Sequence, residues 1–209
     1  KKSRRIYITD TEINHLAHKL AHPTEIIIPT HFDTQLAKPL MRKRAIFHKI
    51  DGLHGHVHLH PHIRPKTVSN PPKVMVRRLL GDGIHDSDEI LQIPENWLEG
   101  LSIFTADENE VTGNPWNLIQ NVANMDGVIT QSVTLASEAV LLGVPTLLIS
   151  KAKRGFLDRL KSDGYPLFVA KEKDESILAQ WLAGIHLTSE LELPDWPNTR
   201  SELLEIIKH

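Results

Sequence analysis

The stretch that decides the fold is Gly127-Val-Ile-Thr-Gln-Ser-Val-Thr134, followed by Leu-Ala-Ser-Glu-Ala-Val-Leu-Leu-Gly143-Val-Pro145. A short apolar run typical of a buried strand enters a hydroxyl-rich turn. Apolar residues then recur at helical spacing from Leu135 to Leu142. Gly143 predicts the end of this helix, because glycine is favoured just beyond a helix C-terminus. Residues 145–149 predict the next strand, and strand, helix and strand at this spacing indicate a parallel sheet.

The same alternation continues on both sides of this stretch. Short apolar runs predict strands at residues 74–76 and 101–104. The sequence Asn114-Pro115-Trp116 predicts a helix start, and helical spacing predicts further helices near 177–182 and 202–207. The expected fold is therefore α/β, with a Rossmann-like parallel sheet and helices on both faces.

The N-terminal part is expected to form a smaller α/β domain. A strand-like run starts at Ile6, and β-branched runs predict strands at 25–29 and 45–50. Thr9 and Glu12 have the spacing of a capping box that opens a helix. The proline-rich residues 64–72 predict a linker. We therefore expect one domain at residues 1–70 and a second at 71–209.

Composition excludes several classes of function. The chain has 209 residues, with 24 Lys and Arg against 26 Asp and Glu, so its net charge is −2 with histidine neutral. This balance argues against binding to nucleic acid or to anionic membranes through net charge. No run approaches the length of a membrane-spanning helix. The absence of cysteine excludes disulfides and thiolate chemistry. These features favour a cytoplasmic protein.

The turn after the first quoted strand predicts an anion site. Ser132, Val133 and Thr134 lie at a helix N-terminus, where free backbone N–H groups and the helix dipole favour phosphate. Glu138 lies one turn further along the same helix face, where its carboxylate can accept hydrogen bonds from sugar hydroxyls. The alternative is that the hydroxyls only cap a structural helix and Glu138 is a solvated charge.

A second candidate group follows the strand at 74–76. Arg77 and the pair His85-Asp86 flank the glycine-rich sequence Gly81-Asp82-Gly83. Arg77 could bind phosphate, and His85 could act as an acid or base with Asp86 orienting its ring. The alternative is a surface turn with a neighbouring ion pair, because Asp-Gly is common in turns.

Five of the 13 histidines alternate in the stretch His54-Gly-His-Val-His-Leu-His-Pro-His62. In an extended chain all five would lie on one face, and neighbours two residues apart could chelate Zn²⁺, Ni²⁺ or Cu²⁺. The alternative, a polar strand face or solvated loop, is favoured because no cysteine or obvious carboxylate ligand accompanies them.

Several blocks, in order, carry a resemblance to a known family. They are Thr9-Asp10-Thr11-Glu12, Gly52 with Leu59-His60-Pro61, Val76-Arg77 with His85-Asp86, and Ser132-x-Thr134-x-x-x-Glu138-Ala139 with Leu142-Gly143-x-Pro145. The chain resembles an uncharacterised, glycosyltransferase-like family of the GT-B superfamily that is related to UDP-N-acetylglucosamine 2-epimerase. The similarity extends over residues 9 to 169.

This resemblance implies two Rossmann-like domains that hold a nucleotide-sugar, expected to be UDP-linked, mainly through the C-terminal domain. It places the diphosphate at the turn from Ser132 to Thr134 and the ribose at Glu138, with Gln131 also among the nucleotide-binding residues. Arg77 would lie in the cleft, with His85 and Asp86 as the catalytic pair. No cofactor and no essential metal ion are expected, because GT-B proteins generally dispense with a bound metal.

Family members carry a whole N-terminal domain before the Asp-Thr-Glu block, whereas eight residues precede Thr9 here. Residues 1–70 are therefore expected to be a remnant of that domain. A second copy or a partner chain would then supply the missing half of the cleft.

Four functional hypotheses follow from these observations. The first is a nucleotide-sugar-dependent glycosyltransferase, and the second is a UDP-sugar 2-epimerase-like enzyme. The third is a non-catalytic domain that keeps the fold as a partner-binding or assembly module. The least favoured is a metal-binding protein that uses the histidine run.

Overall fold

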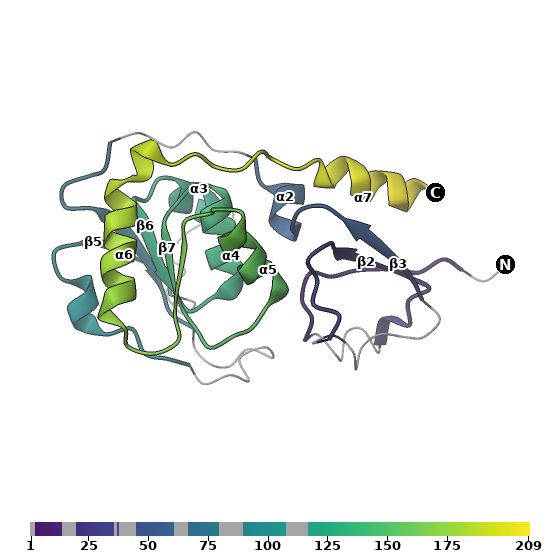
Figure 1. Cartoon of the computed structure of the whole chain (residues 1–209), viewed down its shortest axis with the longest axis horizontal. Helices are drawn as coiled ribbons and strands as arrows, with labels where there is room; N and C mark the ends of the chain where they lie inside the picture. Colours follow the sequence, from purple (N-terminus) through teal and green to yellow (C-terminus); the bar gives the residue numbers. More distant parts are fainter. Residues whose placement is uncertain are drawn as a thin grey trace. The chain divides into compact units, whose positions relative to one another are not determined.

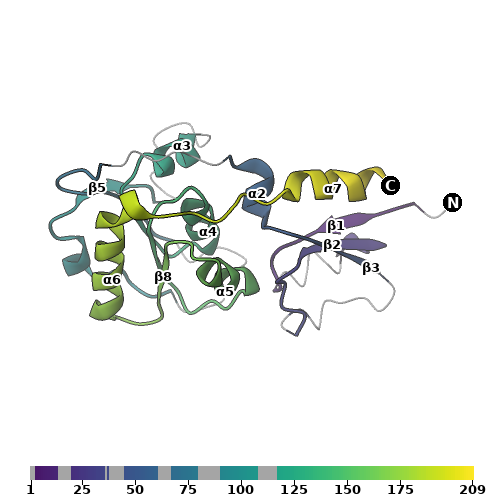
Figure 2. The same cartoon turned by 45° about the horizontal axis from the view of Figure 1, so that its top comes forward.

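The computed structural model describes residues 3–13, 20–35, 37, 45–60, 67–79, 90–107 and 117–209. The chain forms two compact units. The first unit comprises Lys1–Leu59, Lys153–Arg159 and Asp195–His209, and the second comprises His60–Ala152 and Leu160–Pro194. Figures 1 and 2 show the elements of each unit along the chain. The predicted helix start at residues 114–116 lies outside the described residues, as do residues 64–66 of the predicted linker.

The described strands of the first unit form a parallel sheet in the order β1-β2-β3. They are β1 (Ile6–Ile8), β2 (Glu25–Pro29) and β3 (Ile46–Ile50). The middle strand β2 is almost fully buried, as expected for a run of isoleucines that is covered on both faces. The strands predicted at 25–29 and 45–50 are confirmed.

Two helices complete the first unit. α2 (His54–His58) follows β3, and α7 (Thr199–Lys208) comes from the C-terminal end of the chain. Val57 of α2 and Leu203 of α7 pack with Ile27 and Ile50 of the sheet, and both figures show α2 beside α7. The expected second domain, residues 71–209, included α7. The structure instead groups α7 with the first unit, because its apolar face packs there.

The N-terminal strand and α7 are joined by one side chain. Arg4 donates hydrogen bonds to the carbonyl oxygens of Ile206 (2.6 Å) and Ile207 (2.8 Å). Its guanidinium also binds both carboxylate oxygens of Glu25 at the start of β2. A cation suits this position, because the last carbonyl groups of a helix have no partner within the helix and carry partial negative charge.

The described strands of the second unit form a parallel sheet in the order β5-β4-β6-β7-β8. Their bounds are β4 (Lys73–Arg77), β5 (Ser102–Thr105), β6 (Gly127–Thr130), β7 (Thr146–Ile149) and β8 (Leu167–Ala170). The expected Rossmann-like α/β fold is confirmed. Numbered within the unit, the strand order is 2-1-3-4-5, one of the two common orders of doubly wound α/β sheets.

Helices cover both faces of this sheet. They include α3 (Leu118–Ala123), α4 (Val133–Leu141) and α6 (Glu175–His186), with the 3₁₀ turns Glu95–Leu98 and Thr188–Glu190. Figure 1 shows α4 and α6 on opposite sides of the sheet. Trp181 and Ile185 of α6 are fully buried against the sheet residues Ile129 and Leu147. The strands are therefore apolar on both faces, which explains their continuous apolar sequence.

Among the described elements, α5 (Gly155–Ser162) and β8 were not predicted from the sequence. The residues of α5 up to Arg159 group with the first unit. The run Leu-Phe-Val-Ala of β8 after the sequence Gly164-Tyr-Pro166 carries a strand signal of the kind used for β6 and β7.

The histidine run also differs from its prediction. His54–His58 forms helix α2, so the extended, alternating arrangement is wrong for these residues. The helix is favoured because Leu53 and Val57, four residues apart, both face the apolar interior of the first unit. His62 lies outside the described residues.

The predicted capping box is also wrong. The backbone N–H of Thr9 donates to the Ile27 carbonyl at 3.1 Å, and the carboxylate of Glu12 binds other segments instead. The sheet therefore supplies the partner that the box would have provided.

Candidate functional site

The second unit has a topological switch point between β4 and β6. These strands are neighbours in the sheet, but β5, which lies between them in the sequence, pairs on the outer side of β4. The chain therefore leaves β4 and β6 in opposite directions, and open α/β sheets bind ligands beyond the carboxyl ends of such strands. Arg77 and Thr130, the last residues of β4 and β6, are register partners at that edge.

We call the turn after β6, residues 130–135, the elbow. The hydroxyl oxygen of buried Thr130 accepts a hydrogen bond from the Ser132 N–H at 3.0 Å. The Ser132 hydroxyl oxygen accepts from the Leu135 N–H at 3.3 Å, so Ser132 is the N-cap residue of α4. The predicted helix start is therefore confirmed, and these two bonds hold the elbow in one conformation.

Two backbone donors of the elbow have no acceptor among the described residues, the N–H groups of Val133 and Thr134. Thr134 is exposed, while Ser132 and Val133 are half-buried. The N-terminus of a nine-residue helix carries partial positive charge. The elbow thus presents two N–H groups of a helix N-terminus at the carboxyl edge of the sheet.

Gln131 has a different environment from its neighbours in the elbow. Its side chain is buried, with its carbonyl oxygen accepting from the Leu79 N–H at 2.7 Å and its amide donating to the Leu91 carbonyl. Its own N–H donates to the Arg77 carbonyl at 3.3 Å. Gln131 therefore links three loops at the edge of the sheet, a role that its place in the sequence did not reveal.

Two arginines follow β4 at the same edge. The guanidinium of half-buried Arg77 donates to the Ala106 carbonyl at 3.1 Å. Arg78 forms an ion pair with Asp107 at 3.1 Å. These bonds connect the carboxyl ends of β4 and β5, so the guanidinium of Arg77 is held beside the segment after β5, on the side of β4 opposite to β6.

Glu138 lies on α4, one turn beyond Thr134, and is half-buried. Between them, the Ser137 hydroxyl donates to the Thr134 carbonyl at 2.8 Å, so it acts within the helix. The predicted catalytic pair, His85 and Asp86, lies outside the described residues. The structure thus places Arg77 at the C-terminal end of β4 and Ser132 at the N-cap of α4. Val133, Thr134 and Glu138 lie within α4.

The first unit contains a cavity of about 300 Å³. It lies where β1, β2 and β3 end, and it is lined by Tyr7, Ile8, Thr9, Asp10, Thr11, Ile27, Ile28, Pro29, Ile50, Gly52, Leu53, His54, Val57 and Leu203. Sequence reasoning did not find this cavity. The available signal was that polar residues directly follow two of the predicted strands, at the edge where parallel sheets bind ligands.

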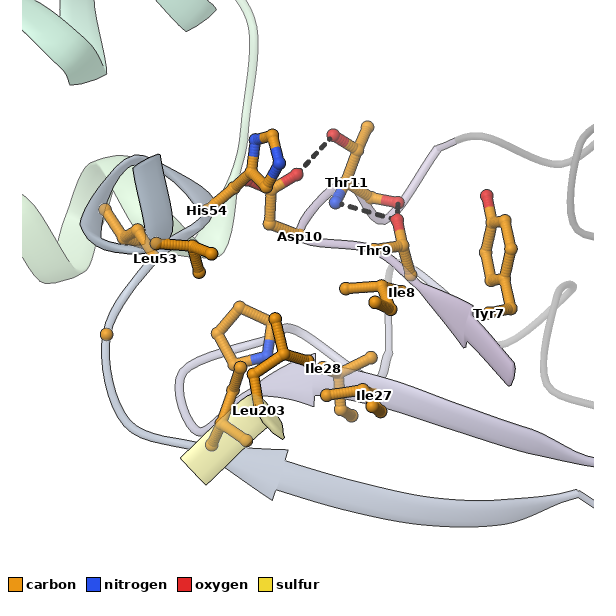
Figure 3. A pocket seen from close by; sticks show the side chains of 14 residues that line it. Tyr7, Ile8, Thr9, Asp10, Thr11, Ile27, Ile28, Leu53, His54 and Leu203 are labelled. Carbon is orange, nitrogen blue, oxygen red and sulfur yellow. Dashed lines mark hydrogen bonds between the residues drawn. The ribbon is translucent and has the colours of Figure 1, made fainter. Parts of the chain in front are cut away.

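The cavity has one polar and one apolar side. Figure 3 shows Asp10 and His54 on one side, with Ile27, Ile28 and Leu203 opposite. The Thr11 hydroxyl donates to the Asp10 carboxylate at 3.2 Å, and the Thr11 N–H donates to the Thr9 hydroxyl oxygen at 3.2 Å. Small-molecule sites commonly combine an apolar wall with a few polar groups in this way.

The described part of the chain contains no group of three or more His, Asp or Glu side chains placed to hold a metal ion. None of the helices in that part combines the length and apolar composition needed to cross a membrane.

Comparisons with known proteins identify a solved structure with a similar fold. No family model matches the sequence, and no curated protein matches it. The fold is similar to that of the wall teichoic acid polymerase TagF, with a TM-score of 0.39 and 12% sequence identity. The alignment covers 90% of this chain and 60% of that chain, so this chain spans less than two thirds of the TagF chain. Function is therefore inferred from the geometry of the sites and not from this likeness.

Proposed function

We propose that the chain is a GT-B-like protein that binds a nucleotide-sugar at the elbow and acts as a glycosyltransferase. The observation that carries this proposal is the pair of unpartnered N–H groups on Val133 and Thr134, located at the switch point of a doubly wound sheet. The blocks that resemble the GT-B superfamily include these same residues.

The diphosphate is assigned to the elbow for electrostatic reasons. The N–H groups of Val133 and Thr134 and the partial positive charge of α4 favour an anion there. Arg77 ends the neighbouring strand and adds a full positive charge at the same edge. The elbow is held by the Thr130 and Ser132 hydroxyls, so its donors need no rearrangement on binding.

The ribose is assigned to Glu138. Four residues of α-helix rise about 6 Å, so the backbone of Glu138 lies about 6 Å further along the helix axis than that of Thr134. A carboxylate accepts hydrogen bonds only, which suits the two vicinal hydroxyls of a ribose. Thr134 and Glu138 share one face of α4, which permits a single ligand to contact both.

The same elements serve glycosyl transfer. The bond between the anomeric carbon and the diphosphate oxygen breaks, and the acceptor oxygen forms the new bond to that carbon while losing its proton. The departing diphosphate carries the developing negative charge, which the elbow N–H groups and Arg77 would stabilise. His85, oriented by Asp86, is proposed to take the proton. No cofactor and no essential cation are proposed for this step.

One substitution tests the elbow directly. Val133→Pro removes a proposed phosphate donor at the first helical position, where proline is tolerated. Ser132 before it has φ −82° and ψ 116°, a conformation suited to the residue preceding proline. Val133→Ala is the matched control, because it shortens the side chain and keeps the N–H group.

Calorimetry with UDP and UDP-N-acetylglucosamine gives the measurement. Val133→Ala is expected to bind as the parent chain does, and Val133→Pro about tenfold or more weaker, the effect of losing a hydrogen bond to a charged group. Equal affinities for the two variants, each with a parent-like circular dichroism spectrum, would remove the elbow from the proposal. Absence of binding by the parent chain would refute nucleotide-sugar binding altogether.

Product analysis separates the enzymatic alternatives. Proton NMR of UDP-N-acetylglucosamine incubated with the chain distinguishes release of UDP, expected for transfer or hydrolysis, from formation of the sugar 2-epimer. Binding without either product, with water as the only acceptor, would favour the non-catalytic assembly module over epimerisation and hydrolysis.

A further inference from the structure

The cavity of the first unit has a charge preference opposite to that of the elbow. Of its described lining residues, Asp10 alone carries a full charge at neutral pH, with histidine counted as neutral. Its half-buried carboxylate accepts a hydrogen bond from the Thr11 hydroxyl at Oδ1, and Oδ2 has no partner among the described residues. Two hydrogen bonds between Thr9 and Thr11 hold the segment that carries Asp10. A ligand in this cavity is therefore expected to bring hydrogen-bond donors or a positive charge.

His54 adds a second polar group to the same side of the cavity. Figure 3 shows the side chains of Asp10 and His54 on that side. The ring nitrogens of His54 have no hydrogen-bond partner among the described residues. A neutral imidazole accepts at one of its two nitrogens, and a protonated primary amine has three N–H donors. One ammonium group therefore has donors enough for both the carboxylate and the ring.

The opposite wall of the cavity is aliphatic. It includes Ile27 and Ile28 of β2 and Leu203 of α7, all of which are buried. Such a wall offers no hydrogen bonds, so hydroxyl groups distributed over a whole ligand would lose their water partners against it. The lining therefore disfavours a polyol and favours a molecule with one polar end and an aliphatic body.

The volume of the cavity limits the size of the ligand. A space of about 300 Å³ equals the volume of about ten water molecules, at about 30 Å³ each. This volume lies at the lower end of the range for small-molecule sites. An ammonium group on a chain of about six carbons is smaller than this limit, whereas a nucleotide is larger.

We propose that the cavity of the first unit binds a small amphiphilic amine. The ammonium group donates to Asp10 and His54, and the aliphatic chain lies against the opposite wall. The bond to Asp10 is charge-assisted and half-buried, so it is stronger than a bond between neutral groups. This site is separate from the elbow, which attracts an anion, and it does not depend on the proposed function.

The test titrates the full chain with n-hexylamine, 1-hexanol and hexanoate, which share one chain length and differ in charge. At pH 8 the amine is protonated, as a lysine side chain is. NMR shifts of the Ile27 and Ile28 methyl groups report occupancy of the cavity. Hexylamine is expected to bind about tenfold more tightly than hexanol, and hexanoate more weakly than hexanol because Asp10 repels it. n-Butylamine is expected to bind about fourfold more weakly for each CH₂ removed.

Asp10→Asn removes the charge and keeps an oxygen acceptor for the Thr11 hydroxyl. It is expected to weaken hexylamine binding about tenfold or more and to change hexanol binding by less than about twofold. Asp158→Asn is the matched control, because Asp158 is an exposed aspartate of the first unit that does not line the cavity.

The ranking of the three probes on the parent chain tests the proposal without any variant. The proposal is overturned if hexylamine leaves the Ile27 and Ile28 methyl signals unchanged, or if hexanol or hexanoate binds as tightly as hexylamine. It is also overturned if Asp158→Asn weakens hexylamine binding as much as Asp10→Asn does.

Discussion

Replacing Glu12 with alanine is expected to destabilise the first unit strongly. Glu12 is fully buried, and its Oε1 accepts hydrogen bonds from the N–H groups of Asp33 (3.1 Å) and Gly155 (3.0 Å). Gly155 is the first residue of α5, so one carboxylate joins the segment after β1, the loop after β2 and the start of α5. Its negative charge also suits the N-terminus of that helix.

The expected magnitude follows from the two donors. Each buried N–H group that loses its acceptor costs about 1–3 kcal/mol. With two such groups, Glu12→Ala is expected to lower the free energy of unfolding by about 2–6 kcal/mol. The free energy of unfolding of a domain is about 5–15 kcal/mol, so this loss would be a large fraction of it. Glu12→Gln keeps an Oε1 acceptor and is expected to lose less. The other oxygen, Oε2, has no hydrogen-bond partner among the described residues.

Urea denaturation of both variants measures the loss, and amide hydrogen exchange locates it. The amides of Asp33 and Gly155 are expected to lose protection in Glu12→Ala before amides of the second unit do. If Glu12→Ala costs less than about 1 kcal/mol, or if both amides keep their protection, then Glu12 does not hold these segments together.

Two further changes test other parts of the structure. The hydrogen bond from Arg4, followed by that with His48, lowers the pKa of Glu25 from 4.5 to about 2. This ion pair therefore adds to the free energy of unfolding above pH 4.5, and the contribution is lost as the pH falls towards 2. The urea midpoints of Arg4→Ala and the parent chain should converge over that range. A constant difference between the two midpoints would refute the linkage. Gly127→Ala would place a methyl group 2.7 Å from Ile185 Cδ1, with an expected loss of about 1–3 kcal/mol in thermal or urea unfolding. Adding Ile185→Val, which removes that atom, should recover part of the loss, and strictly additive effects would contradict the contact.

The elbow was predictable because its signals are local. Ser132 caps a helix through the N–H three residues ahead, and Gly143, with φ of 77°, follows that helix as expected. The cavity was not predictable. Asp10 and His54 are 44 positions apart in the sequence, and only the pairing of β1 with β2 and of β2 with β3 brings their strand ends to one edge.

The sequence by itself determined the alternating α/β pattern and the start of α4, because periodicity and capping depend on residues within a few positions of each other. Tertiary structure alone decided the partners of Glu12, which lie 21 and 143 positions away, and the return of α7 to the first unit. It also decided that residues 54–58 form a helix, although their alternation suited a strand equally well. Each of these outcomes depends on which sequence-distant segment packs against a side chain. The neighbouring residues in the sequence do not determine that segment.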